Sequence, residues 1–241
     1  MDNRMLKLAE SIENNALGLD DTFQFQCNAC GKCCKNRHDI MLTIRDLYNI
    51  AKLLGRTVPY IVERYCDIYI GETSRLPIVR LLPNGPEQTC PFLLNRRCTV
   101  HNAKPVVCAL YPLGRGVKKA KADNGDDQPE KVHPIYFFHP VSCGSKDQTH
   151  TVCSWLGQFN IPVEDDFYTF WTEAVIILSD FFHILEDNNA PDSIKKPLWD
   201  LVFSAMYICY DVEKDPMSQF HDNMMKLLNI FAGIEKLTGG Q

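Results

Sequence analysis

The sequence has little concentrated positive charge. Lysine and arginine total 25 against 30 aspartates and glutamates, which gives a formal net charge of −5 at pH 7. No basic run is longer than "VKKAK" at 117–121. A surface that neutralises the phosphates of nucleic acid needs clustered positive charge. We therefore expect no nucleic-acid partner.

The sequence also lacks an uninterrupted apolar segment of membrane length. Its first residues, "MDNRMLKLAESIENNALGLDD", carry acidic residues early and contain no continuous apolar stretch. Neither a signal peptide nor a membrane span fits this pattern. We therefore predict a cytoplasmic protein without membrane association.

Cysteine, by contrast, is abundant. The chain has 241 residues, of which 45% are hydrophobic and 11 are cysteine. A chain of this size and composition buries a sufficient core without disulfides. Cytosolic thiols stay reduced, so a dense cysteine pattern there indicates metal binding or catalysis. The odd total also argues against complete disulfide pairing.

Hydrophobic periodicity predicts helices in two parts of the chain. Residues 41–66 read as two helices, with Thr43 and Thr57 as N-caps and Gly55 as the left-handed stop. Short strands are expected near 68–70, 78–82 and 133–140, and an exposed loop or hairpin tip over 115–132. Three further helices are expected over roughly 164–187, 191–211 and 216–237.

These elements predict a mainly α, α+β fold. We expect an irregular cysteine-rich metal-binding segment with short strands, packed against a C-terminal helical layer. Residues 1–160 would form the cysteine-cluster region, and residues 161–241 a helical region within the same domain.

The chemistry concentrates in "CNACGKCC" at 27–34 and "CPFLLNRRCTVHNAKPVVCALYP" at 90–112. The C-x2-C-x2-C spacing lets three sulfurs converge on one centre. It begins the ferredoxin-type run that ligates iron–sulfur clusters, and it also suits a zinc knuckle. Ala29 and Gly31 are small enough for backbone N–H groups to approach the sulfurs. The candidate ligands are Cys27, Cys30, Cys33, Cys34, Cys90, Cys98, Cys108 and Cys143.

The number of sites stays open at this point. Adjacent residues rarely aim both side chains at one metal, so Cys34 serves a second centre, completes a site with other segments, or does not ligate. The eight thiols suit one four-thiolate site with spares, or two sites. His38 and His101 are expected to be neighbours more often than ligands. Lys32, Lys35, Arg37, Arg96 and Arg97 are expected to be surface charges that can also offset thiolate charge.

The remaining cysteines have a simpler interpretation. Cys66 and Cys209 lie on the apolar faces of predicted helices, and Cys153 lies beside aromatic residues. Buried cysteine commonly acts as a small hydrophobic residue. We expect all three in the core.

The two cysteine segments, with "IMLTIRDLYNIAKLLG" between them, resemble the CxxCxxCC (YkgJ-like) family of zinc- or iron-chelating proteins. The order and spacing match from about Phe23 to Pro112, and loosely on to Cys143. The resemblance implies the same eight cysteines as metal ligands, with Cys143 the least certain match. The chain departs from the family at Ala109 and Lys104, where relatives carry arginine.

Two functions of different classes are expected. The first is a metal protein with an unassigned cellular task that carries an iron–sulfur cluster of the [4Fe–4S] type, because such a cluster needs four thiolates and the chain offers more than four, or alternatively zinc. The second follows from flagellin lysine methylases in the family: an S-adenosylmethionine-dependent lysine methyltransferase. No G-x-G-x-x-G that would cradle that cofactor is present. Thiol redox catalysis is disfavoured, because no βαβ pattern surrounds Cys27 and Cys30. A protein partner or protein substrate stays open.

Overall fold

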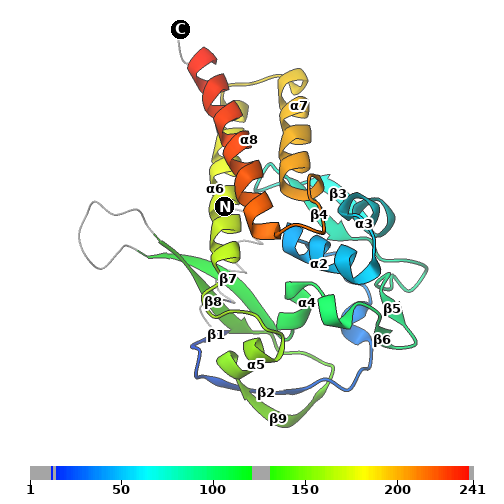
Figure 1. Cartoon of the computed structure of the whole chain (residues 1–241). Helices are drawn as coiled ribbons and strands as arrows, with labels where there is room; N and C mark the ends of the chain where they lie inside the picture. The colour runs from blue at the N-terminus through cyan, green and yellow to red at the C-terminus, as the bar shows by residue number, and fades with distance from the viewer. Residues whose placement is uncertain (1–11, 13–14, 121–130, 239–241) are drawn as a thin grey trace. The chain divides into compact units, whose positions relative to one another are not determined.

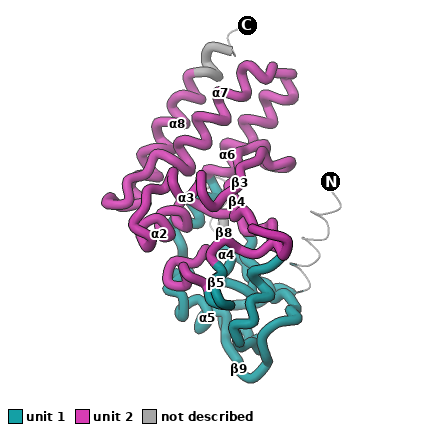
Figure 2. The backbone as a smooth tube through the Cα atoms, turned by 90° about the vertical axis from the view of Figure 1, so that its right-hand side faces the viewer, with its two compact units in different colours: residues 1–35, 93–97, 106–173 teal, residues 36–92, 98–105, 174–241 magenta. Residues whose placement is uncertain are grey.

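The protein is described by a computed structural model that covers Ile12, residues 15–120 and residues 131–238. Its contacts divide the chain into two compact units, each built from three stretches of sequence (Figure 2). Unit 1 comprises residues 1–35, 93–97 and 106–173, and unit 2 comprises residues 36–92, 98–105 and 174–241.

Unit 1 holds two antiparallel sheets. The first has the order β1 (Ala16–Leu17), β8 (Lys131–Phe138) and β7 (Leu113–Ala120), with β7 and β8 paired along their whole length (Figure 1). In the second, β2 (Thr22–Gln26) pairs with β9 (Ser145–Thr151). The strand at 133–140 is thus confirmed. Of the loop predicted over 115–132, the outer parts are strand, and residues 121–130 lie outside the described residues.

The core of unit 1 follows from strand alternation. In β2, "TFQFQ", Phe23 and Phe25 are buried while their neighbours face outward, as the two-residue period of a strand requires. Both rings meet Trp155 edge to face, with centroids 5.6 and 5.8 Å apart. Trp155 lies on α5 (Val152–Gln158), and its indole Nε1 donates to the carbonyl of Leu110 at the end of α4 (Val106–Leu110), 3.0 Å away. The cluster therefore joins β2, α4 and α5 in one apolar core.

Unit 2 begins with a pair of capped helices, α2 (Ile44–Leu54) and α3 (Val58–Tyr65). Thr43 caps α2, Gly55 adopts φ 61°, and Thr57 caps α3, all as predicted. The reciprocal capping box between Thr43 and Asp46 was not predicted. The antiparallel pair β3 (Cys66–Ile70) and β4 (Pro77–Leu81) follows. A small sheet of β5 (Leu93–Leu94) and β6 (Arg97–Cys98), and the short helix η2 (His101–Ala103), lie in the second cysteine segment.

The C-terminal helices form a layer in unit 2. They are α6 (Asp166–Asp187), which leaves unit 1 after Glu173, α7 (Asp192–Phe203) with the π-turn η3 (Ser204–Ile208), and α8 (Pro216–Thr238). Stacked rings join them: Phe181 on Phe231 at 4.3 Å, and Phe182 on Trp199 at 5.8 Å. The three predicted helices are confirmed, and so is the mixed α+β class with short sheets and a helical C-terminal region.

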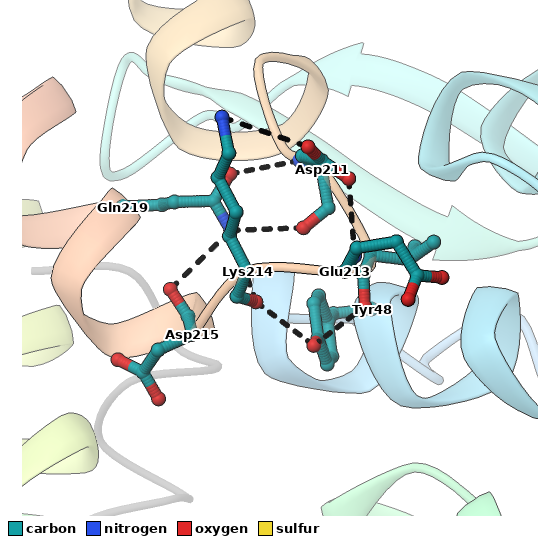
Figure 3. Close-up of polar contacts among 7 residues, drawn as sticks. Tyr48, Asp211, Glu213, Lys214, Asp215 and Gln219 are labelled. Atoms are coloured by element: carbon teal, nitrogen blue, oxygen red, sulfur yellow. Dashed lines mark hydrogen bonds and ion pairs between the residues drawn. The ribbon is translucent and has the colours of Figure 1, made fainter.

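The connection from η3 to α8 is held by polar contacts within unit 2 (Figure 3). The Tyr48 hydroxyl on α2 donates toward the carbonyls of Val212 and Lys214, at 2.8 and 2.9 Å. The Gln219 side chain accepts from the Asp211 amide at 2.8 Å. Asp215 caps α8 through the amide of Ser218 at 2.7 Å. These contacts satisfy backbone groups that the helix end leaves without partners.

Candidate metal centre

The first cysteine motif folds as a tight turn in unit 1. Ala29 and Gly31 both adopt positive φ, 52° and 72°, and the 3-10 turn η1 (Lys32–Cys34) follows. Successive backbone N–H groups in turns that include left-handed residues can form concave surfaces that bind anions and iron–sulfur clusters. The turn places Cys33 and Cys34 on adjacent positions with their sulfurs 3.9 Å apart.

A distant segment of unit 1, residues 142–145, returns beside this motif. Ser145 pairs with Gln26 at the end of β2, one residue before Cys27. Gly144 has φ 74°, and a Cβ placed there would lie 2.6 Å from the Gln26 carbonyl oxygen and 2.5 Å from the Phe25 ring. The Lys32 ammonium donates to the carbonyl of Ser142 at 3.4 Å. Residue 143 is therefore held next to the first motif from both sides.

Cys143 interacts with two thiols of that motif. Burial raises the pKa of the Cys143 thiol, the Tyr111 hydroxyl acts in the opposite direction, and the neighbouring Cys30 and Cys33 raise it further. Two sulfurs of the first motif thus affect the Cys143 thiol, which lies more than a hundred residues later in the sequence of unit 1. A divalent metal or cluster would remove the protons from such thiols when it binds.

Tyr111 also faces this group. Its hydroxyl oxygen lies 3.0 Å from the Cys143 sulfur. Its ring meets Phe25 edge to face, with centroids 6.0 Å apart. Both Tyr111 and Cys143 pack against the apolar core of unit 1.

The other predicted ligands are distributed between the units. Cys27 is exposed, and Cys34 and Cys108 are half-buried, all three in unit 1. Cys90 and Cys98 are half-buried and belong to unit 2. His101 is exposed, and its pKa is lowered by desolvation and by Lys104.

The thiols are reduced, and they do not form an assembled group of metal ligands in the described residues. None of the eleven cysteines, all within the described residues, takes part in a disulfide. Across the described residues, no three His, Cys, Asp or Glu side chains already stand in metal-ligating positions. Metal binding supplies the energy that draws ligands into place, so the donor set is the informative feature here. Several thiols beside concave backbone suit zinc or an iron–sulfur centre.

Two cysteine predictions outside the motif were wrong. Cys209 and Cys153 are exposed. Cys209 follows the π-turn η3, which rotates it off the apolar face that a regular helix would give, and Cys153 lies on the outer side of α5. Cys66 is partly buried at the junction of α3 and β3, and burial raises its pKa to about 12.

The sequence interpretation missed the residues that hold Cys143 in place. Tyr111 belongs to the Tyr-Pro pair that ends the second cysteine segment and was given no role of its own. Gly144 directly follows the last candidate cysteine. A glycine next to a predicted ligand signals close backbone approach, and that signal was available. The contact between Tyr111 and Cys143 had no local signal, because the two residues lie 32 positions apart in the sequence.

Comparison with known families agrees with the cysteine pattern. Residues 26–133, a little under half of the chain, match the CxxCxxCC family model, described as a "Putative zinc- or iron-chelating domain". No curated protein and no solved structure gave a significant match to the chain. None of the helices in the described part of the chain combines the length and apolar character needed to cross a membrane.

Proposed function

We propose that the protein carries a [4Fe–4S] cluster through cysteine thiolates, and the match of residues 26–133 to the CxxCxxCC model of a zinc- or iron-chelating domain supports this. The ligands are drawn from Cys27, Cys30, Cys33, Cys34, Cys90, Cys98, Cys108 and Cys143. Zinc in the same thiolates is the alternative. The matched description names zinc or iron and no methyl donor, so the methyltransferase alternative remains a prediction.

One observation carries the proposal: in unit 1 the Cys143 segment is held beside the first cysteine motif by the pairing of Ser145 with Gln26 and by the hydrogen bond from Lys32 to Ser142. A cubane cluster needs four thiolates. Cys30 and Cys33 come from the closely spaced motif, and Cys143 comes from a segment tied to it by Gly144 and Lys32. Unit 1 also contains Cys27, Cys34 and Cys108 as sources of a fourth ligand.

The surroundings favour a cluster in two further ways. The positive φ angles at Ala29 and Gly31 are those of anion-binding backbone, and a thiolate-ligated cluster is anionic. The Lys32 ammonium lies beside the Ser142 carbonyl and adds positive charge next to the thiols. When bound, the cluster would supply one-electron redox chemistry or act as a structural centre, while the chain provides ligands, charge and a partly buried setting.

Metal analysis of anaerobically purified protein tests the proposal. We expect about four iron and about four sulfide ions per chain, with the Mössbauer and EPR signatures of a cubane cluster. Stoichiometric zinc without iron would establish the alternative. Protein that binds neither metal would overturn both.

Two serine variants identify the site. Cys143→Ser is expected to lose most of the metal, because it removes a ligand of the centre. Cys209→Ser is the control, since Cys209 is exposed and belongs to unit 2, and it should retain the full metal content. Equal metal content in the two variants would exclude Cys143 as a ligand.

A further inference from the structure

The hydroxyl of Tyr111 is fixed at the Cys143 sulfur by the fold of unit 1. The two atoms are 3.0 Å apart, within hydrogen-bond distance. Tyr111 follows α4, whose last carbonyl, at Leu110, is held by the Trp155 indole at 3.0 Å. Its ring packs edge to face on the buried Phe25. The phenol therefore has little freedom to turn away.

The segment that carries the sulfur is also held in place. Gly144, at φ 74°, lies so close to the Gln26 carbonyl and the Phe25 ring that a Cβ at this position would clash with both, and the Lys32 ammonium donates to the Ser142 carbonyl at 3.4 Å. The same Phe25 thus supports Tyr111 on one side and the Cys143 segment on the other. One core residue therefore lies next to both of the segments that this hydrogen bond joins.

The direction of this hydrogen bond depends on the state of the sulfur. A neutral thiol can donate or accept, whereas a metal-bound thiolate has no proton and only accepts. When Cys143 ligates a metal, Tyr111 must therefore be the donor. Such a bond withdraws electron density from the ligand sulfur and favours the reduced, more negative state of a cluster.

From this geometry we infer that Tyr111 is a positioning residue of the metal centre: its hydroxyl donates to the Cys143 sulfur and raises the reduction potential of the cluster. The inference rests on the proposed [4Fe–4S] centre. It adds a residue outside the cysteine ligands and assigns it one measurable effect. Tyr111 itself neither ligates the metal nor transfers electrons.

Tyr111→Phe tests the inference, because it removes only the hydroxyl and keeps the ring on Phe25. We expect an unchanged iron content. The equilibrium constant for reduction of the cluster should fall about tenfold, which for a one-electron couple makes the reduction potential about 59 mV more negative. EPR-monitored redox titration measures it. Tyr60→Phe, on an exposed tyrosine of unit 2, is the matched control and should not move the potential.

A second measurement keeps the test decisive if Tyr111→Phe does not fold. Global replacement of the 9 tyrosines by 2,3-difluorotyrosine makes each phenol a stronger donor without removing it. The potential should then move in the positive direction, opposite to Tyr111→Phe. An intact cluster whose potential does not respond overturns the role of Tyr111 and leaves the proposed function standing. Wild-type protein without iron overturns both.

Discussion

At the scale of single residues, the glycines at 144 and 157 show that the effect of adding a side chain depends on its position in the fold. Gly144 has a positive φ, and a Cβ there would lie 2.5 Å from Phe25 and 2.6 Å from Gln26. Gly157 lies in α5, and outside its chain neighbours and the backbone of that helix no atom stands within 4 Å of where its Cβ would be. The first glycine is required by the fold, whereas the second is replaceable.

Gly144→Ala and Gly157→Ala should therefore change stability in opposite directions. Gly144→Ala should lower the free energy of unfolding by about 2–4 kcal/mol, because left-handed strain and overpacking add. Gly157→Ala should raise it by about 0.5–1 kcal/mol through helix propensity. Urea denaturation measures both. A neutral Gly144→Ala would contradict the close approach of residue 144 to the first motif.

The cysteines outside the motif should differ in their reactivity. The thiolate is the species that alkylates, and burial raises the pKa of Cys66 to about 12, so this thiol is neutral at pH 8. Cys153 and Cys209 are exposed. Iodoacetamide at pH 8 should modify these two well before Cys66, as followed by peptide mass spectrometry over time. Labelling of Cys66 at the rate of Cys153 would contradict its burial.

At the scale of elements, helices with local sequence signals were predicted, whereas a strand pairing between distant segments was not. Helices α2, α3, α6, α7 and α8 were predictable because the apolar period and the caps at Thr43, Gly55 and Thr57 are local, whereas the short helices α4 and α5 were not predicted. Strand β9 was not predicted. Its sequence, "SKDQTHT", has no apolar alternation, and its partner β2 lies more than a hundred residues earlier. The pairing that brings Cys143 to Cys30 thus comes from tertiary structure.

The cap of α8 should give a pH-dependent contribution to stability. Hydrogen bonds from the Ser218 backbone and side chain hold the pKa of Asp215 below its ordinary value. The carboxylate therefore stabilises the folded state above that ordinary value, near pH 4, and the stabilisation is lost as pH falls through the lower folded pKa.

Asp215→Asn isolates this effect, because asparagine remains an N-cap but has no charge. The melting temperature of the variant should lie below that of the wild type by a constant amount from pH 5 to 8. The two curves should converge below about pH 4. Circular dichroism melts across this range measure the difference. A gap that persists at low pH would assign the effect to something other than the carboxylate charge.

At the scale of the whole molecule, the two units are interleaved along the sequence. The boundary predicted at residue 160 remains a proposal, and residues just beyond it contribute to unit 1. Ile161 is part of the unit 1 core. Asp165 pairs with Arg115 at 3.3 Å, with side-chain exposures of 2% and 8%. The Arg115 guanidinium also lies over the Tyr168 ring, 3.5 Å from its centroid.

A fragment of residues 1–160 should therefore fail to unfold cooperatively in urea. It removes Asp165 and Tyr168, the carboxylate and the ring that Arg115 contacts, and breaking a buried ion pair costs about 3–5 kcal/mol. Asp165→Asn in the full chain is the milder comparison and should unfold cooperatively at a lower urea concentration. A fragment with a sharp, native-like transition would place the domain boundary at 160 after all.

In the candidate site, too, the closely spaced cysteines were recognisable from the sequence, whereas their distant neighbour was not. The spacing of Cys27, Cys30 and Cys33 was sufficient to predict metal binding, because three thiols within seven residues have few other uses. The partner of this motif was the uncertain element, since Cys143 stands alone in the sequence. Its place became clear only from the β2–β9 pairing and from Gly144.

The neighbourhood of Cys30 and Cys143 also imposes an order on biosynthesis. About 110 residues separate the two thiols in the sequence, although they interact in unit 1. A ribosome that adds about 5–20 residues per second needs roughly ten seconds to span that interval. The emerging N-terminal turn must wait that long for Cys143, so iron delivered to the nascent polypeptide would at first be held by the early thiols alone.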